Sequence, residues 1–185
     1  AAAADPLAFR LDHTSDPRIR AVLERLGAVT HWGGDLPDRH GTGVAMVKSF
    51  ETIVAQAVQV SVSEDGGVRV HKVWSVVDCG RLINPSAGEA QITGSVIYGL
   101  TSALWGEITL QDGAIQQLNF PDYPMMQLAN APTQEVHFIP SDAAPGGLGE
   151  PGVPPVTPAL TNAIYAVTGD RIRTLPIGKH GLHVV

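Results

Sequence analysis

The amino-acid sequence predicts an α+β fold with mixed or antiparallel strands and about three helices. Runs rich in Val, Ile and Thr lie on both sides of the triplet Asp65-Gly66-Gly67, a pattern typical of a hairpin with a tight turn. Three other segments carry apolar residues at helical spacing, and each follows a capping residue and a Pro. With 44% hydrophobic and 16% charged residues, the chain is expected to build a packed core.

The first helix is predicted to begin at Pro17, with Asp16 as its cap, and to end at Gly27. Its apolar stripe consists of Ile19, Val22, Leu23 and Leu26. The stretch 33–43 is rich in Gly, Asp and His and is predicted to be a polar loop.

Several strands are predicted after this loop. Residues 44–63 and 68–78 form the expected antiparallel pair. A second hairpin is expected from 107–110 and 114–118, and one more strand from 134–139. At the end of the first pair, Asp78 is expected to cap a turn, and the only cysteine, Cys79, to fill a small buried space.

The other two helices follow the same Pro-containing pattern. The second is predicted to start at Asn84-Pro85 and the third at Thr157-Pro158, with Gly169 as the end of the third. The expected buried stripe of the second helix is Ile92, Val96, Leu100, Ala103 and Leu104. That of the third is Leu160, Ala163, Ile164 and Val167.

Small and polar residues occupy another face of the second helix. Gln91, Gly94, Ser95, Gly99 and Ser102 lie roughly on this one face, related to one another by spacings of three and four. Such a face permits close approach of a neighbouring backbone or of a ligand, and the sequence pattern alone leaves both possibilities open.

Composition excludes several classes of function. A net charge of −6 without a Lys/Arg run argues against nucleic-acid binding. No apolar run reaches the 18 or so residues of a transmembrane helix. A single cysteine excludes an internal disulfide, and the seven histidines form no ligand motif, so no metal site built from side chains is expected.

Glu150 is the only acid in residues 144–155, a run with four glycines, four prolines and no Lys or Arg. Such a run forms neither a helix interior nor a strand interior, because Gly is flexible and Pro lacks an N–H donor. The segment is either a plain surface turn or a loop that holds one carboxylate in place. A carboxylate without a partner cation is suited to act as a general base.

Three blocks in the same order resemble the large subunit of the molybdenum hydroxylases, the xanthine dehydrogenase/aldehyde oxidase family. The first is Val-Val-Asp-Cys-Gly-Arg-Leu-Ile-Asn-Pro (76–85) with 91–100, and the second is Asn-Phe-Pro-Asp-Tyr (119–123) with 131–132 and 136–138. The third is Gly-Glu-Pro-Gly-Val-Pro-Pro (149–155), continued by 156–164 and 168–176. The resemblance extends from about Asp5 to Pro176. Its nearest branch is the isoquinoline 1-oxidoreductase β-subunit type, which includes aldehyde dehydrogenases of bacteria.

The resemblance implies a function and a site. The fold would be part of a molybdopterin-binding domain, and the reaction would be oxidation of an aldehyde or an N-heterocycle with water as the oxygen source. Glu150 would be the general base. Gln91 would hydrogen-bond the pterin, and Gly94, Ser95 and Gly149 would line the cofactor site. The pterin, rather than protein side chains, would hold the molybdenum.

The resemblance also implies partners. It matches the C-terminal part of the large subunit, so residues 1–185 are expected to form one segment that begins within a domain. The molybdopterin, in its cytosine dinucleotide form, would be shared with a partner chain or a missing segment. The [2Fe–2S] clusters would lie on another, small subunit. Bacterial cytoplasm and periplasm are both compatible with this reading. The alternative is a non-catalytic assembly or interaction module with the same fold.

Overall fold

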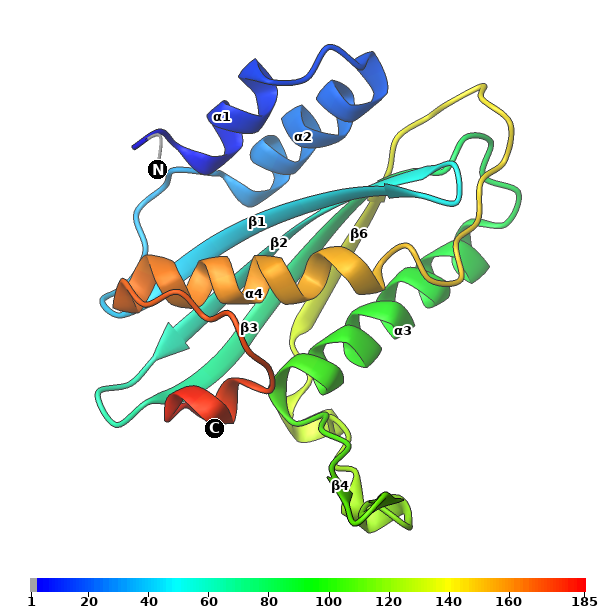
Figure 1. Cartoon of the computed structure of the whole chain (residues 1–185). Helices are drawn as coiled ribbons and strands as arrows, with labels where there is room; N and C mark the ends of the chain where they lie inside the picture. The colour runs from blue at the N-terminus through cyan, green and yellow to red at the C-terminus, as the bar shows by residue number, and fades with distance from the viewer. Residues whose placement is uncertain (1–2) are drawn as a thin grey trace.

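The computed structural model describes residues 3–185, which form a mixed five-stranded sheet between two layers of helices (Figure 1). The strands are β1 (His40–Ser49), β2 (Thr52–Val62), β3 (Gly67–Asp78), β6 (Thr133–Phe138) and β7 (His183–Val184). β1, β2 and β3 are antiparallel neighbours, whereas β6 and β7 both pair in parallel with β3. The predicted α+β class is therefore confirmed.

Two pairs of helices cover the sheet. The helices α1 (Pro6–Asp12) and α2 (Pro17–Thr30) lie on one face, and α3 (Pro85–Leu104) and α4 (Val153–Thr168) lie on the other (Figure 1). Alternate residues of β2 point to opposite faces, as the pleat of a strand requires. Ile53 and Ala55 pack with α2, while Val58 and Val60 pack with α3 and α4.

The predicted stripes of the helices are largely buried. The α2 stripe buries Val22, Leu23 and Leu26, and the α3 stripe is buried at all five predicted positions. In α4, Leu160, Ala163 and Ile164 are buried and Val167 is partly buried. Asn84 caps α3 as expected, because its side chain accepts a hydrogen bond from the N–H of Ala87.

The predicted strand over 44–63 is wrong, because this segment is two strands joined at Phe50-Glu51. Both turn residues have positive φ, 52° and 61°, which matches the twist of a two-residue hairpin loop. Such turns usually contain Asn or Gly, so the sequence carries no signal for this one. β1 also begins at His40, inside the stretch predicted to be a loop.

The predicted helix end at Gly27 is also wrong. The helix α2 continues to Thr30 and ends at His31, whose φ of 49° is left-handed. Gly27 is needed for packing, since a Cβ there would lie 2.8 Å from Cδ2 of Leu7 in α1. The helix α1 itself was not predicted, although Asp5-Pro6 starts it with the same device of a cap followed by Pro.

The start of α4 differs from the prediction as well. The helix begins at Val153, not after Thr157, because Pro154 and Pro155 lie in the first turn, where a helix needs no N–H donors. The Thr157 hydroxyl donates instead to the carbonyl of Gly99 in α3, at 3.4 Å. Gly169 ends the helix as predicted, with a φ of 79°.

An arm formed by residues 106–131 extends away from the sheet, at the lower edge of Figure 1. It contains the predicted second hairpin, reduced to β4 (Leu110–Gln111) and β5 (Ala114–Ile115), and two short 3-10 turns, Phe120–Asp122 and Leu128–Asn130. Its apolar side chains are largely exposed: Ile108, Leu110, Ile115, Leu118, Phe120, Met125 and Leu128. Among the described residues, no helix is long and apolar enough to cross a membrane.

Candidate functional site

A pocket of about 400 Å³ lies between α3 and the loop that leads into α4. Its lining includes all five residues singled out in the sequence: Gln91, Gly94, Ser95, Gly149 and Glu150. The structure therefore brings together two segments that are far apart along the chain. Their proposed roles toward a cofactor and a substrate stay predictions.

Two glycines keep this pocket open. A Cβ built at Gly94 or at Gly149 would have no heavy-atom neighbour within 4 Å, so it would project into free space. The side chains of Gln91 and Glu150 are exposed beside these glycines. An occupant of the pocket can therefore approach the backbone closely and meet an amide and a carboxylate.

Ser95 contributes to the pocket mainly through its small size. It is 5% exposed, and its hydroxyl donates to the carbonyl of Ile92 at 2.7 Å. Gly152 packs directly on it, since a Cβ at Gly152 would lie 2.0 Å from the Ser95 oxygen. The hydroxyl hydrogen is thus used within α3, and Ser95 offers an occupant only its oxygen as an acceptor.

Backbone donors are available on the glycine-rich loop. In the part of the chain that the structure describes, the N–H groups of Gly149 and Glu150 form no hydrogen bond. The first N–H of α4, that of Val153, donates to the carbonyl of Glu150 at 2.9 Å, and the two prolines that follow have none. The donors that can face an occupant are therefore the N–H groups of the loop, the Gln91 amide and the hydroxyl of Tyr98, which also lines the pocket.

Sequence reasoning missed Tyr98, which also lines the pocket and is 61% exposed. The signal was present, because Tyr98 follows Gln91 and Gly94 at positions that share one helix face. A second hollow, of about 250 Å³, adjoins the pocket and shares Gln91 with it. This second hollow adds Arg81 and Asn84, so a guanidinium lies on the same side of the molecule.

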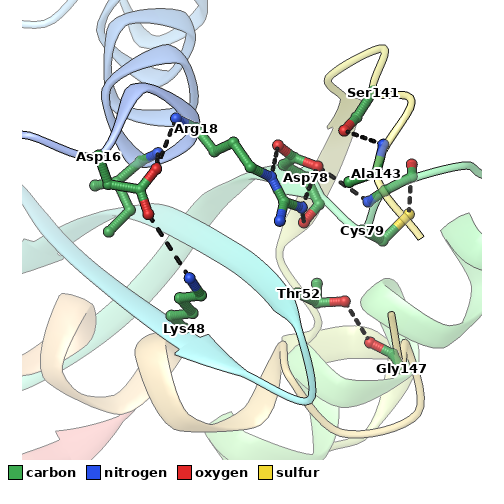
Figure 2. A network of polar contacts seen from close by, with 11 residues as sticks. Asp16, Arg18, Lys48, Thr52, Asp78, Cys79, Ser141, Ala143 and Gly147 are labelled. Carbon is green, nitrogen blue, oxygen red and sulfur yellow. Dashed lines mark hydrogen bonds and ion pairs between the residues drawn. The ribbon is translucent and has the colours of Figure 1, made fainter. Parts of the chain in front are cut away.

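An ion pair between the buried Asp78 carboxylate and the partly exposed Arg18 guanidinium lies at the end of β3. Asp78, which is 1% exposed, accepts hydrogen bonds from Arg18 Nε and Nη2 at 2.8 and 2.7 Å (Figure 2). It also accepts the N–H of Gly80 at 3.0 Å, which confirms the predicted turn cap. Cys79 is buried as predicted. The role of Arg18, 60 positions away along the chain, had no local sequence signal.

The pair shifts the pKa values of both partners. Burial alone would raise the pKa of Asp78, but the hydrogen bonds from Arg18 and Gly80 outweigh it and lower that pKa below its usual value. The hydrogen bond to Asp78 likewise raises the pKa of Arg18. Burial raises the pKa of the Cys79 thiol, which disfavours its thiolate form.

No group of three or more His, Cys, Asp or Glu side chains that could hold a metal ion occurs among residues 3–185. The pocket combines an open backbone, unused N–H donors, one side-chain amide and one carboxylate. These features suit the edge of an organic cofactor better than a bare metal ion.

Comparison with known protein families identifies the family to which the chain belongs. Residues 19–132, more than half of the chain, match the family model described as "Molybdopterin cofactor-binding domain". The chain therefore belongs to the molybdopterin cofactor-binding domain family. The matched residues include Gln91, Gly94 and Ser95 and end before the loop that carries Glu150.

Curated relatives agree with the family. The chain is 32% identical over 179 residues to the isoquinoline 1-oxidoreductase subunit beta of Brevundimonas diminuta, covering 94% of the chain and 23% of that protein. It is 32% identical to a membrane-bound aldehyde dehydrogenase of Gluconacetobacter polyoxogenes, covering 86% of the chain and 22% of that protein. It is 34% identical to the aldehyde oxidoreductase molybdenum-binding subunit PaoC of Escherichia coli K12, over 68% of the chain and 18% of that protein. The chain thus spans about a fifth of the length of these relatives.

Solved structures show the same fold. Quinoline 2-oxidoreductase from Pseudomonas putida 86 matches 68% of the chain and 17% of its own chain, with a TM-score of 0.64 and 23% identity. Aldehyde oxidoreductase from Desulfovibrio gigas matches 68% of the chain and 14% of its own, with a TM-score of 0.59 and 22% identity.

The pocket residues fit a pterin. A pterin ring presents hydrogen-bond donors and acceptors along a flat edge, and the Gln91 amide can serve both kinds. The unused N–H groups of Gly149 and Glu150 supply further donors. The absence of a side chain at Gly94 and Gly149 leaves room for a flat group to lie against the backbone.

Proposed function

We propose that the chain forms part of the active site of a molybdenum-dependent oxidoreductase that hydroxylates an aldehyde or an N-heterocycle, with water as the oxygen source. The family membership and the names of the relatives support this reaction class. The observation that carries the proposal is the shared pocket of Gln91 and Glu150.

Gln91 and the N–H of Gly149 would hold the pterin, and Gly94 would let it approach α3. When bound, the molybdopterin supplies the metal that accepts the electrons removed from the substrate. The proposal includes the cytosine dinucleotide form of the cofactor, the remaining part of the large subunit as the other wall of the pocket, and [2Fe–2S] clusters on a small subunit. Names such as "subunit beta" and "molybdenum-binding subunit" among the relatives support an assembly of this kind.

Glu150 would act as the general base. Oxidation of an aldehyde to an acid adds oxygen from water and releases protons as well as electrons, so a proton acceptor is needed beside the reacting carbon. The Glu150 side chain is exposed to the pocket and forms no ion pair among the described residues. Its carboxylate is therefore available to take a proton.

The direct test is the substitution Glu150→Gln in the assembled enzyme. Loss of a general base typically costs about 10²-fold or more in turnover. Molybdenum and pterin contents should stay at the wild-type level, since the amide keeps the shape of the side chain. The matched control is Glu89→Gln, an exposed acid of α3 that does not line the pocket. Wild-type turnover of the Glu150 variant would contradict the assignment.

One observation favours the alternative of a non-catalytic assembly module with the same fold. The arm 106–131 exposes large apolar side chains, among them Phe120 at 92% and Leu128 at 93%. Exposed apolar patches often mark contacts with other proteins. The same experiment separates the two readings, because an assembly module would purify without pterin and Glu150→Gln would change nothing.

A further inference from the structure

Two fully buried polar side chains of β2 lie beneath the loop that carries Glu150. Thr52 and Gln56 are both 0% exposed, and their spacing of four places them on the same face of the strand. That face packs against α3 and α4 and is otherwise apolar. Burying a polar side chain costs free energy unless it is hydrogen-bonded, so these two residues need an explanation.

Each of the two side chains holds one end of the loop. The Thr52 hydroxyl donates to the carbonyl of Gly147 at 2.8 Å (Figure 2). The Gln56 Nε2 group donates to the carbonyl of Gly152 at 3.1 Å and to Ser75 Oγ at 3.1 Å. Glu150 lies between the two anchored carbonyls, which belong to residues 95 and 96 positions away from their donors along the chain.

The Gln56 amide joins the loop to the sheet, because its Nε2 group donates both to Gly152 and to Ser75 of β3. Its Oε1 atom is buried without a hydrogen-bond partner among the described residues. Rotating the Gln56 amide by 180° would exchange Nε2 and Oε1. Oε1 would then face the Gly152 carbonyl oxygen, and the hydrogen bond from Nε2 to that carbonyl would be lost. An apolar side chain of similar size would avoid the unpaired oxygen, so packing alone does not account for Gln56.

The backbone between the two anchors is also restrained. The N–H of Gly147 donates to the carbonyl of Phe50 at 2.8 Å, and that of Val153 to the carbonyl of Glu150 at 2.9 Å. Pro151 is buried and fixes its own φ. Both ends of the loop around Glu150 are thus tied to β2.

We propose that Thr52 and Gln56 are positioning residues, which hold the Glu150 loop so that its carboxylate faces the pocket shared with Gln91. The consequence for turnover rests on the proposed function. The anchoring of the loop by Thr52 and Gln56 is independent of the proposed function and can be measured separately.

The first test measures kcat and KM in the assembled enzyme. Gln56→Met and Thr52→Val remove the donors at nearly constant volume, and each should lower kcat by about tenfold, since displacement of a reacting group by about 1 Å can cost up to about 10². KM should change by less than about twofold, because the substrate-binding groups stay in place. Gln59→Met makes the same change at a half-buried position of β2 and should leave kcat unchanged. The conservative variant Thr52→Ser keeps the hydroxyl donor, and its kcat should equal that of the wild-type enzyme.

The second test combines Gln56→Met with Glu150→Gln. If Gln56 acts through Glu150, the double variant is no slower than Glu150→Gln alone. A further tenfold loss in the double variant would show that Gln56 acts elsewhere and would overturn the proposal.

The third test is amide hydrogen exchange within residues 144–153 of the assembled protein, read at the hydrogen-bonded N–H groups of Gly147 and Val153, and it does not depend on turnover. Gln56→Met and Thr52→Val should each speed exchange of this segment by about tenfold without affecting β2 and β3, and Gln59→Met should not. Unchanged exchange would overturn the anchoring. Faster exchange together with wild-type turnover of Glu150→Gln would support the anchoring and refute only the role of Glu150 as base.

Discussion

The two faces of the sheet hold their helices by different means. On the face covered by α1 and α2, the helices pack through apolar contacts, and two ion pairs tie the start of α2 to the sheet: Arg18–Asp78 at the end of β3, and Asp16–Lys48 on β1 at 3.7 Å. On the face covered by α3 and α4, buried polar side chains and glycines occur at the contacts: Thr52, Gln56, Ser75, Ser95, Gly99 and Gly152. These residues surround the loop that leads to the pocket.

The glycines of the second face divide into two kinds. A Cβ at Gly99 would lie 2.4 Å from a methyl group of Val156, and one at Gly152 would lie 2.0 Å from Ser95, so these two permit close packing of α4 on α3. A Cβ at Gly94 or Gly149 would meet nothing. Substitutions on the α2 face are therefore expected to change stability. Substitutions at the open positions of the α3/α4 face, Gly94 and Gly149, are expected to change function.

The largest expected effect on stability follows from Arg18→Met. The variant leaves the Asp78 carboxylate buried without its cation, which should lower the free energy of unfolding by about 3–5 kcal/mol. Denaturant unfolding of residues 1–185 measures it. Arg25→Met removes an exposed guanidinium of α2 that has no hydrogen bond or ion pair among the described residues, and it should cost less than about 1 kcal/mol. Equal losses in both variants would show that the ion pair with buried Asp78 contributes no more to stability than an exposed guanidinium.

The same pair predicts a smaller effect of pH. Because the folded-state pKa of Asp78 is lowered, its contribution to stability is complete above its unfolded value of 3.8 and is lost as the pH falls through the lower folded value. The free energy of unfolding of the wild-type chain should therefore decline below about pH 4 more steeply than that of Asp78→Asn. Parallel declines, measured by urea unfolding at a series of pH values, would show that other carboxylates carry the effect.

The smallest effect is expected from Gly94→Ala, and it has opposite signs for stability and function. Alanine in the middle of α3 should stabilise the chain by up to about 1 kcal/mol, because its Cβ has no neighbour. The same Cβ projects into the pocket and should lower the pterin content of the assembled enzyme. Gly99→Ala, which meets Val156, should instead destabilise the chain by about 1–3 kcal/mol. A Gly94→Ala enzyme with full pterin content would show that the cofactor does not approach this helix.

The sequence predicted those parts of the molecule that local chemistry determines. The Asn84-Pro85 start of α3 and its buried stripe follow from capping and from helical periodicity, and both are confirmed. The turn at Phe50-Glu51 could not be predicted, because neither residue type favours positive φ. The donors Arg18 and Gln56 reach their partners across 60 and 96 positions, which no local pattern encodes.

The candidate site likewise contains some residues that the sequence predicted and others that only the folded structure reveals. Glu150 and Gln91 were selected by composition and by resemblance, and the structure brings them to one pocket. The support beneath them, from Thr52 and Gln56, depends on a strand register that exists only in the folded chain. The sequence therefore allows the residues that line the pocket to be predicted, but not the buried residues that fix the position of the loop beneath them.

The most direct test of Glu150 as the base is a single-turnover measurement. Wild-type and Glu150→Gln enzymes with equal molybdenum content are mixed with saturating substrate, and the rate of cofactor reduction is followed by stopped-flow absorbance. Single turnover separates chemistry from substrate binding and product release. The account predicts a rate at least about 10²-fold lower in the variant. Equal rates in the two enzymes would contradict it.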